Sequence, residues 1–500
     1  MIDVAVKEIP DDWEMATFGE VAELLRGVGY KKPDASTEPE TGKVPVLRAN
    51  NIGYGLNFEK LVYVPKHLVK GEQFIKKGDI IIAMSSGSKH LVGKAAQANE
   101  DYHGGYGAFC ANLRTLDGIN AKYVAYFYSS PNNLKRISAS SKGSNINNLK
   151  REHILNAPIP IAPFEQQKRI VAKIEELFSH IDAGIEALNK AKQLLKQYRQ
   201  SVLKAAVTGE LTKEWREQNK DKLEPASQLL ERIQRNRESE YEEAFENWKA
   251  EVKCWEINGK VGRKPARPKK NKITELQKIN DSEIPENWVF APLSAAAKID
   301  IGFAFKSKEF EEEGISLLRG DNIEPGSLRW KNRKCWPEAK LPGFEHLFIE
   351  EGDVILAMDR PVISSGLKIA IAKKEDLPAL LVQRVARIFS EASSCSKYIY
   401  YVLSSDDFIN HCLGSQTGTQ LPHISGAQIE DFCFGLPSAI EQARIVEELE
   451  KQFDAIIRLE KEIDIQLGKT EKNKQSILAS AFSGDLVGCC LLYTSDAADE

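Results

Sequence analysis

Cysteine is scarce in this chain of 500 residues, and its eight cysteines are scattered along it. None of them forms a Cys-x-x-Cys pair that is matched by a second pair or by histidines at ligand spacing. This pattern argues against a structural zinc site and against a disulfide framework. We therefore expect no metal in the chain and a reducing, cytoplasmic location.

Long apolar runs are also missing. No stretch approaches the roughly 18 consecutive apolar residues that a membrane-spanning helix needs. The first residues, MIDVAVKEIPDDW, lack the basic segment followed by an apolar segment that marks a secretory signal. We therefore expect neither a membrane partner nor export.

Recognisable catalytic motifs are absent as well. The stretch GSKHLVGKA (87–95) lacks the spacing of a phosphate-binding loop and has Ala95 where such a loop carries a metal-binding hydroxyl. The sequence has no Gly-rich cofactor loop after a strand, no Gly-x-Ser-x-Gly, no His-Glu-x-x-His and no Asn/Asp-Pro-Pro-Tyr/Phe motif of adenine methyltransferases. We therefore expect no catalytic residue and no cofactor in this chain.

Net charge indicates no partner by itself. The formal charge is −4 with 28% charged residues, so the binding of a polyanion would have to depend on local arrangement. Length and composition are more informative, because 500 residues allow about three domains. The hydrophobic content of 42% is enough for globular cores.

The most informative feature is an internal repeat. The stretch KKGDIIIAM (76–84) returns as EEGDVILAM (350–358), where Asp353 follows Asp79 by 274 residues. Five further pairs keep their order at offsets of 271 to 275 residues: IPDDW (9–13) and IPENW (284–288), LRANNI (47–52) and LRGDNI (318–323), KYVAYFYSS (122–130) and KYIYYVLSS (397–405), QKRIV (167–171) and QARIV (442–446), and SVLKAAVTGEL (201–211) and SILASAFSGDL (476–486). Since this period is too long for a solenoid, we infer the duplication of a folded unit.

Each copy begins with a mixed α/β part. Short apolar runs such as DIIIAM are bounded by Gly and Asp, which is typical of strands, and a helix is expected near residues 120–137. We predict one mixed α/β domain at 1–165 and a second at 283–440.

The end of each copy changes to a period of seven residues, which predicts a central long helix at 166–211 and a C-terminal long helix at 441–487. Each helix would be about 60 Å long, which is more than a small domain can cover. We therefore predict that the two helices form an antiparallel coiled coil and that the two domains are pseudo-symmetric. The alternative is a core helix for each domain. The predicted pairing residues are Ile174, Ile181, Leu188, Leu195, Val202, Leu449, Ile456, Leu459, Ile463 and Ile477.

Residues 212–282 have no counterpart in the repeat. They are rich in Lys and Glu with a helical pattern, and they end in KVGRKPARPKKNK (260–272), which has seven basic residues and no acidic one. We interpret 212–282 as a charged, solvated linker, with a contact to nucleic acid or a partner as the alternative.

Polar loops stand at three matching places in both copies. Arg can bond both acceptors of guanine and Asn both edge groups of adenine, so the loops that contain LRANNI and LRGDNI could contact bases. The loops after the shared strand, 85–90 and 359–366, differ completely, as expected for two different targets. A third pair is 143–148 and 418–423, and a simple turn is the alternative for each loop. The predicted DNA-binding residues are Arg48, Asn50, Asn51, Ser85, Ser86, Ser88, Lys89, Asn145, Arg319, Asp321, Asn322, Arg329, Lys331, Asp359, Arg360 and Gln420.

Local charge supports a phosphate contact unevenly. Residues 43–155 contain 16 Lys and Arg against 7 Asp and Glu. Residues 301–430 contain 15 against 18, so the second copy would have to use a local patch, for which RWKNRK (329–334) is the best candidate.

Together these features resemble a known family. A mixed domain that ends in PIPIAPFEQQKRIV, a heptad helix that closes with AAVTGEL, a linker that contains LEPASQLLERI and a second copy of the whole are similar to the specificity subunit of Type I restriction-modification systems. The resemblance covers roughly residues 8–487. The last residues, 488–500, break from both the repeat and the family, and we interpret them as a non-native tail.

The resemblance implies a subunit that is not catalytic by itself. Each of two target-recognition domains would bind one half of an asymmetric bipartite site in double-stranded DNA. Two methyltransferase subunits would methylate adenine at N6 with S-adenosylmethionine, and restriction subunits would use ATP and Mg to translocate and cleave unmodified DNA.

Two other interpretations stay open. The chain could be a fragment of a single-chain restriction-methylation enzyme, or a coiled-coil scaffold without a role in DNA binding. The DNA sequence, the spacer length and the individual base contacts do not follow from the loops, because they depend on a docking pose.

Overall fold

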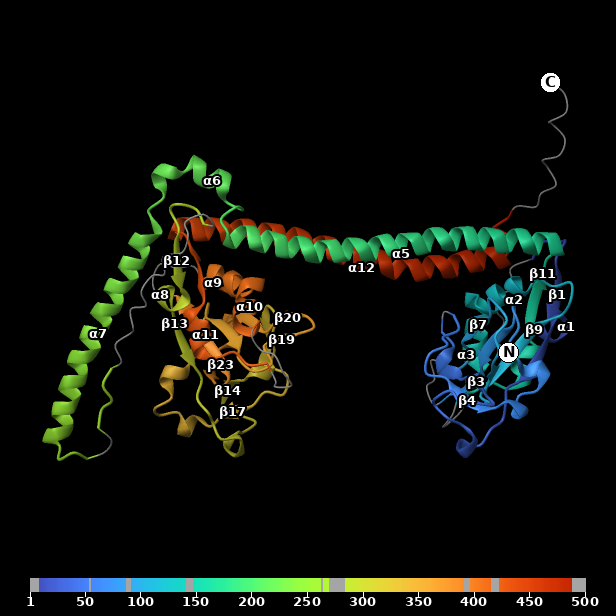
Figure 1. Ribbon diagram of the computed structural model, residues 1–500, viewed down its shortest axis with the longest axis horizontal. Helices are drawn as coiled ribbons and strands as arrows, with labels where there is room; N and C mark the ends of the chain where they lie inside the picture. The colour runs from blue at the N-terminus through green and yellow to red at the C-terminus, as the bar shows by residue number, and fades with distance from the viewer. Residues whose placement is uncertain are drawn as a thin grey trace, which may run out of the picture. The chain divides into compact units, whose positions relative to one another are not determined.

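The computed structural model describes residues 9–53, 55–86, 91–140, 147–261, 264–268, 284–390, 396–414 and 422–487 (Figure 1). The chain divides into two compact units. Unit 1 comprises residues 1–191 and 462–500, and unit 2 comprises residues 192–461. One long helix, α5 (Phe164–Val207), begins in unit 1 and ends in unit 2, and a second, α12 (Ala439–Phe482), does the reverse.

Unit 1 is a mixed α/β fold built on small sheets. Its main sheet has the order β2-β9-β5-β7, and a three-stranded sheet has the order β4-β3-β8. The strands are β1 (Glu14–Thr17), β2 (Ala22–Arg26), β3 (Lys43–Leu47), β4 (Val62–Pro65), β5 (Ile80–Ala83), β6 (Ser85–Ser86), β7 (Ala95–Gln97), β8 (Gly105–Tyr106), β9 (Cys110–Thr115), β10 (Asn147–Asn148) and β11 (Pro158–Ile161). The shorter helices are α1 (Phe18–Val21), α2 (Ala121–Tyr128), α3 (Pro131–Ser140) and α4 (Arg151–Leu155).

Unit 2 repeats this strand order. Its main sheet is β13-β23-β18-β21 and its three-stranded sheet is β17-β14-β22. The strands are β12 (Val289–Pro292), β13 (Ala297–Ile301), β14 (Ile315–Leu318), β15 (Ile323–Glu324), β16 (Ser327–Leu328), β17 (Cys335–Trp336), β18 (Val354–Ala357), β19 (Val362–Ile363), β20 (Gly366–Leu367), β21 (Ile369–Ile371), β22 (Ala379–Leu381), β23 (Val385–Ser390) and β24 (Cys433–Leu436). The helices are α6 (Lys213–Gln218), α7 (Ala226–Ile257), α8 (Leu293–Ala296), α9 (Ser396–Leu403), α10 (Asp406–Leu413) and α11 (Gly426–Asp431).

The shared strand of the repeat is central in both main sheets, where β5 and β18 are buried on both faces. Ile80 and Ile82 enter one apolar cluster, while Ile81 and Ala83 enter another. This division follows from the two-residue period of a strand. In unit 2, alternate residues of β18 divide between two clusters in the same way. The buried strands β5 and β18 therefore form the centre of the main sheet in their units.

The core of unit 1 also includes the end of α12. The Phe482 ring packs on the rings of Tyr123 and Phe127, with both pairs of centroids 5.1 Å apart. Two residues later Gly484 has φ +85°, and a Cβ atom on it would lie 2.3 Å from Cγ of Pro10. Only glycine fits this close approach at a positive φ. The start and the end of the described chain are therefore packed together within unit 1.

Unit 2 contains the matching junction. Gly209 has φ +82°, and a Cβ atom there would lie 2.5 Å from Cγ of Pro285. Both glycines come from the repeated Thr/Ser-Gly-Glu/Asp-Leu element, and both prolines from the repeated Ile-Pro element. The end of each long helix therefore packs on the segment that opens a copy of the repeat.

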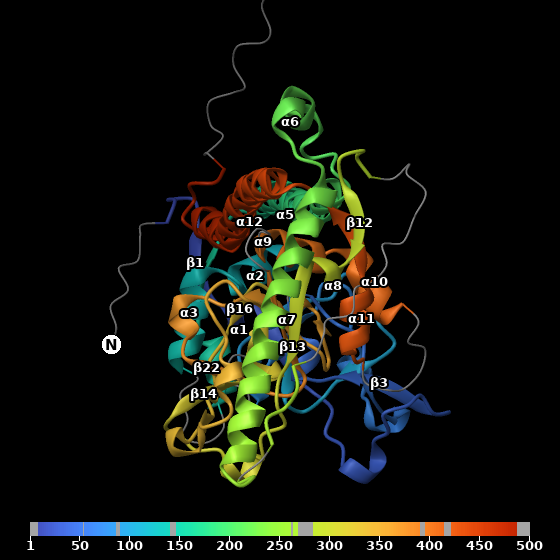
Figure 2. The same ribbon diagram turned by 90° about the vertical axis from the view of Figure 1, so that its left-hand side faces the viewer.

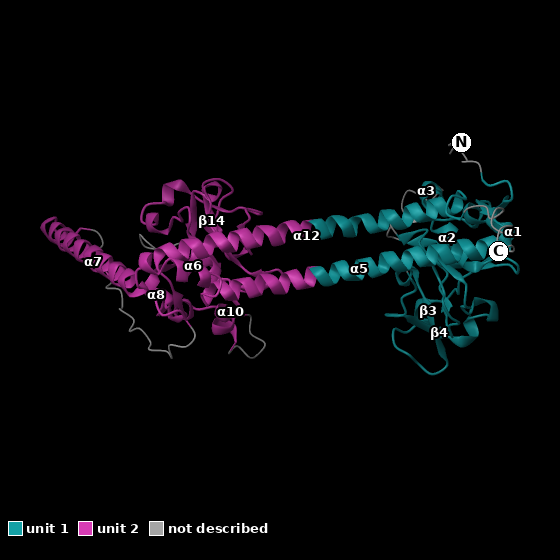
Figure 3. Cartoon of the chain, turned by 90° about the horizontal axis from the view of Figure 1, so that it is seen from above, with its two compact units in different colours: residues 1–191, 462–500 teal, residues 192–461 magenta. Residues whose placement is uncertain are grey.

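Helices α5 and α12 each have one part in unit 1 and one part in unit 2 (Figure 3), and they contact each other in both units. In unit 1, Lys474 Nζ lies 2.6 Å from Asp182 Oδ1 and 5.2 Å from the centre of the Phe178 ring. In unit 2, Tyr198 Oη donates to Gln452 Oε1 at 3.2 Å. The first part of α5 thus contacts the last part of α12, and the last part of α5 contacts the first part of α12.

Nine of the ten predicted pairing residues are buried or half-buried. Ile174, Val202, Leu449, Ile456 and Ile463 are buried, and Ile181, Leu188, Leu195 and Ile477 are half-buried. The prediction is wrong for Leu459, whose side chain is 53% exposed. At this turn Glu460 faces Arg199 of α5 instead, because a residue four positions after Ile456 lies closer to its face than one three positions after it.

The segment between the copies is less solvated than expected. The first two turns of α7 bury Leu229, Leu230 and Ile233 in the core of unit 2. Further along, Arg237 Nη1 donates to Ser294 O at 2.7 Å and Glu240 pairs with Lys298, so α7 lies beside α8 and β13 (Figure 2).

Part of the basic run also packs on α7. Trp248 Nε1 donates to Pro265 O at 3.1 Å, and the Arg267 guanidinium lies 5.1 Å from the centre of the Phe245 ring. Residues 264–268 of this run therefore follow an aromatic face of α7.

Candidate nucleic-acid interface

The first polar loop of unit 1 is a short 3₁₀ turn, Ala49–Asn51, that follows β3. Arg48 and Asn50 are exposed, whereas Asn51 is 2% exposed. Asn51 Oδ1 accepts from the Arg48 backbone N at 3.0 Å, and its Nδ2 donates to Asn57 O and Glu59 O. The prediction that Asn51 contacts a base is therefore wrong, because its amide is used to hold the loop.

Unit 2 repeats this construction. Asn322 is 1% exposed, its Oδ1 accepts from the Arg319 backbone N at 3.1 Å, and its Nδ2 donates to Arg329 O at 3.0 Å. The prediction for Asn322 is wrong for the same reason, since a buried amide must satisfy its own hydrogen bonds. The neighbouring Asp321 is exposed, and Arg319 is half-buried with Nη2 donating to Asn332 O.

The basic patch proposed for the second copy is exposed on a turn. Arg329 pairs with Glu324 at 2.9 Å, and Lys331 is exposed. Between them, Trp330 Nε1 donates to Asp376 Oδ1 at 2.8 Å and so anchors the turn to the unit. Lys331 is therefore exposed on this turn, whereas Arg329 and Lys334 are each paired with a carboxylate.

The structure brings the second and third polar loops together in each unit. In unit 1, β6 pairs antiparallel with β10, with Ser85 opposite Asn148. In unit 2, Asp359 forms a β-bridge with His423 at the equivalent place. Four predicted residues, Ser88, Lys89, Asn145 and Gln420, lie outside the described residues.

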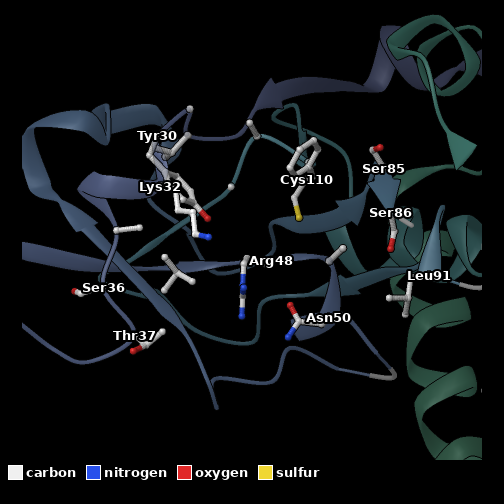
Figure 4. Close-up of a pocket in the computed structure, with 18 residues that line it drawn as sticks. Tyr30, Lys32, Ser36, Thr37, Arg48, Asn50, Ser85, Ser86, Leu91 and Cys110 are labelled. Carbon is white, nitrogen blue, oxygen red and sulfur yellow. The ribbon is translucent and has the colours of Figure 1, made fainter. Parts of the chain in front are cut away.

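A pocket of about 860 Å³ joins the first and second loops of unit 1. Figure 4 shows Arg48 and Asn50 between Tyr30 and Lys32 on one side and the two serines of β6 on the other. The pocket is lined by Val28, Gly29, Tyr30, Lys32, Ala35, Ser36, Thr37, Arg48, Ala49, Asn50, Val62, Ser85, Ser86, Leu91, Gly107, Ala108, Phe109 and Cys110. Four of the sequence-predicted residues thus face one site.

The polar groups of this pocket favour binding over chemistry. Burial raises the pKa of the Cys110 thiol to about 12, so the thiol stays protonated. Burial also raises the pKa of Tyr30, although the nearby Arg48 opposes the shift. Arg, Lys, Ser and Asn side chains around an open hollow supply hydrogen bonds to base edges or phosphates.

The matching region of unit 2 is a charged cluster. His423 Nδ1 lies 2.7 Å from Asp359 Oδ1, and Arg384 Nη1 lies 3.3 Å from His423 Nε2. Burial lowers the pKa of Lys368, with Asp321 opposing this shift and Arg360 adding to it. Asp321 of the first loop and Arg360 of the second loop therefore both act on Lys368 in unit 2.

Sequence reasoning missed three residues beside these loops, namely Tyr30, Lys32 and Phe109 in unit 1. Tyr30 and Lys32 come from the segment after β2, which carries no repeated motif. Phe109 precedes β9, and only the pairing of β9 with β5 places it beside Ser85. No signal in the sequence marked these positions.

The described residues contain no group of three or more His, Cys, Asp or Glu side chains that could hold a metal ion. Within the same described ranges, none of the helices has the length and apolar character needed to span a bilayer.

Comparisons with known proteins agree on one family. A family model described as the Type I restriction modification DNA specificity domain matches residues 10–194. The Type I restriction enzyme EcoKI specificity subunit of Escherichia coli (strain K12) is 29% identical over 484 residues, which cover 96% of this chain and 90% of that protein.

Solved structures show the same fold over nearly the whole chain. The HsdS subunit from Thermoanaerobacter tengcongensis matches with a TM-score of 0.54 and 16% identity, covering 96% of this chain and 99% of its own. A chain from a study of complex assembly and conformational transition of the type I R-M system matches with a TM-score of 0.60, 16% identity and the same coverages. With its repeated α/β units and two long helices, this chain is similar over nearly its whole length to the specificity subunits of Type I restriction-modification systems.

Proposed function

We propose that the chain recognises an asymmetric bipartite site in double-stranded DNA, with one half bound by each copy of the repeat. The observation that carries this proposal is a contrast at equivalent positions. The buried strands are alike in the two copies, whereas the exposed or half-buried residues that follow them differ. Asn50, Ser85 and Asn148 of the first copy correspond to Asp321, Asp359 and His423 of the second.

The chemistry of these residues suits base recognition. Arg48 and Arg319 are shared and follow equivalent strands, so they supply a common guanidinium for a phosphate or a guanine. The residues that differ exchange amide and hydroxyl groups for carboxylate and imidazole groups. Such an exchange changes which base edges can be bonded, and two unlike half-sites follow from it.

The long helices support the assembly part of the proposal. We propose that α5 and α12 form one antiparallel coiled coil, that the two copies are related by a pseudo-two-fold axis, and that 1–165 and 283–440 are the target-recognition domains. The contact of Lys474 with Asp182 and that of Tyr198 with Gln452 agree with opposite helix directions. Residues 212–282 would then connect the copies.

The catalytic parts would come from other subunits. We propose that two methyltransferase subunits, which use S-adenosylmethionine, and restriction subunits, which use ATP and Mg, dock on this chain. The lack of recognised catalytic motifs in its sequence is consistent with a subunit that only selects DNA.

Mapping methylated adenines in the host genome, with the gene present, deleted and restored, tests the proposal. The expected result is one asymmetric bipartite motif that disappears on deletion and returns on restoration. An unchanged set of methylated motifs after deletion would contradict the proposed function.

A further inference from the structure

One position beside the recognition loops has the same backbone role in both units but carries unlike side chains. It is the residue directly before β9 in unit 1 and before β23 in unit 2, namely Phe109 and Arg384. Met84 N donates to Phe109 O at 2.8 Å, and Met358 N donates to Arg384 O at 2.9 Å. Both residues are therefore fixed against the end of the shared central strand, where the second loop begins.

The side chain of Phe109 is unusually open to solvent. It is 69% exposed, although large apolar side chains in cores of this chain are almost fully buried. The residue lines the same pocket as Arg48, Asn50 and Ser85. An apolar ring among polar groups suits the C5 methyl group of thymine, which is the apolar feature of the major groove.

The side chain of Arg384 is exposed too, but it is oriented by partners. Its Nε lies 3.7 Å from Asp359 Oδ2, and its Nη1 lies 3.3 Å from His423 Nε2. Its φ of 72° is in the left-handed region, which non-glycine residues seldom adopt, and such strain clusters at functional sites. A guanidinium held in a fixed direction suits the two acceptors of guanine.

We propose that this position determines specificity in each half-site, with Phe109 contacting a thymine methyl group and Arg384 contacting guanine. The inference rests on the proposed function and adds to it one recognition residue per copy. It also explains why Asp359 and His423 are paired, since together they orient the guanidinium.

The experiment uses the complete chain with its partner subunits in a host that lacks the native gene, with genome-wide mapping of methylated adenine. Arg384→Ala is expected to weaken the preference for one base pair in the half-site bound by unit 2. The loss of selectivity at that position should be about 5- to 150-fold. Arg384→Lys is expected to relax the same pair, because a Lys ammonium lacks the two-pronged geometry. Phe109→Ala is expected to relax one pair of the other half-site by roughly 3- to 10-fold.

Matched controls lie in the same units but away from the loops. Leu116, just beyond the opposite end of β9, is 41% exposed, and Arg444 pairs with Glu447 on helix α12. Leu116→Ala and Arg444→Ala are expected to leave the motif unchanged. The melting temperature of each variant shows that the chain is folded.

The outcomes separate this inference from the proposed function. If the unsubstituted chain produces no bipartite motif, the proposed function fails. If the unsubstituted chain produces a bipartite motif, and Phe109→Ala and Arg384→Ala keep the same base preference at every position, only the inference is overturned. A uniform loss of methylation without a change of motif would also overturn it, because that result indicates phosphate contacts alone.

Discussion

The two units have tryptophans at equivalent positions, Trp13 and Trp288, whose hydrogen-bond acceptors differ in charge. In unit 2, Trp288 Nε1 donates to Glu441 Oε2 at 2.9 Å, and Oε1 of this fully buried carboxylate accepts from Thr212 Oγ1 and Arg216 Nη1. In unit 1, Trp13 Nε1 donates instead to Gln166 at 3.1 Å. A buried carboxylate needs a cation nearby, whereas a buried amide does not.

The sequence offset explains this difference. The residue of unit 1 that is equivalent to Thr212 is Val487, which has no hydroxyl group to donate. The position equivalent to Glu441 is Gln166, a nearly isosteric neutral residue that is 5% exposed. The two units therefore share the tryptophan hydrogen bond, and the acceptor is a buried carboxylate in unit 2 and a buried amide in unit 1.

The largest effect is expected for Glu441→Ala. This change leaves the Arg216 guanidinium, which is only 13% exposed, without its buried carboxylate partner, and the loss of a partner from a buried pair costs about 3–5 kcal/mol. Urea unfolding followed by tryptophan fluorescence measures the free energy of unfolding. The control is Glu447→Ala on the same helix, whose exposed pair with Arg444 is worth less than about 1 kcal/mol. Equal losses in the two variants would contradict the distinct role of Glu441.

The reciprocal change, Gln166→Glu, introduces a buried charge into unit 1. We expect a loss of about 2–3 kcal/mol at neutral pH, since the partner of the Gln166 side chain is the neutral Trp13 indole. Burial should raise the pKa of the new carboxyl, so the penalty is absent below the unfolded pKa and grows as the pH rises. Unfolding at pH 4 and pH 7 tests this sign, with Gln166→Met as a control that loses only the hydrogen bond. A loss that does not depend on pH would show that the carboxylate finds a partner.

A smaller contrast is expected for the Asp of the repeated Gly-Asp turn. Asp79 accepts two hydrogen bonds from Arg114, at 2.7 and 2.6 Å, whereas in unit 2 Arg387 lies 2.8 Å from Asp300 and 3.7 Å from Asp353. We expect Asp79→Asn to cost about 2 kcal/mol and Asp353→Asn about half of that, because Arg387 keeps a carboxylate partner. Urea unfolding of both variants gives the two losses. A larger loss for Asp353→Asn would reverse the comparison.

The pH dependence of Asp353 sharpens this contrast. Burial is the main cause that raises its pKa, and the nearby Arg387 guanidinium opposes the rise. A raised pKa in the folded state contributes stability that is present below the unfolded pKa and lost as the pH rises through the folded value. The stability of the unsubstituted chain relative to Asp353→Asn should therefore fall as the pH rises from about 4.

The smallest effect is expected on the long helices. Lys474→Ala removes a 2.6 Å ion pair with Asp182, whose side chain is 60% exposed, so the loss should stay below about 1 kcal/mol. High salt should remove most of the difference from the unsubstituted chain. A loss above about 2 kcal/mol, measured by thermal unfolding, would show that the contact between the helices depends on this pair.

The central strands and the long helices could be predicted from the sequence because their sequence patterns are local or repeated. The run of isoleucines in β5 and its echo in β18 required a buried strand twice, and the heptads required two long helices. Leu459 was assigned wrongly because a straight α-helix drifts away from an exact seven-residue repeat. The count alone therefore does not show which residues face the other long helix.

The candidate recognition residues were harder to predict for a physical reason. Asn51 and Asn322 looked like base-contacting amides, but the same chemistry lets an amide cap its own turn, and burial decides between the two roles. Arg48, Asn50 and the serines of β6 were predicted to contact DNA, and that role stays a prediction. Their grouping around one pocket depends on strand pairing, which no local pattern encodes.

The junction of Gly484 with Pro10 has a consequence for synthesis. Most of unit 1 leaves the ribosome first, yet its core includes Phe482, which is made near the end of translation. Unit 2 closes through Gly209 and Pro285, which are only 76 residues apart in the sequence. Contacts between distant residues form late, so the half that is made first should be the last to finish folding.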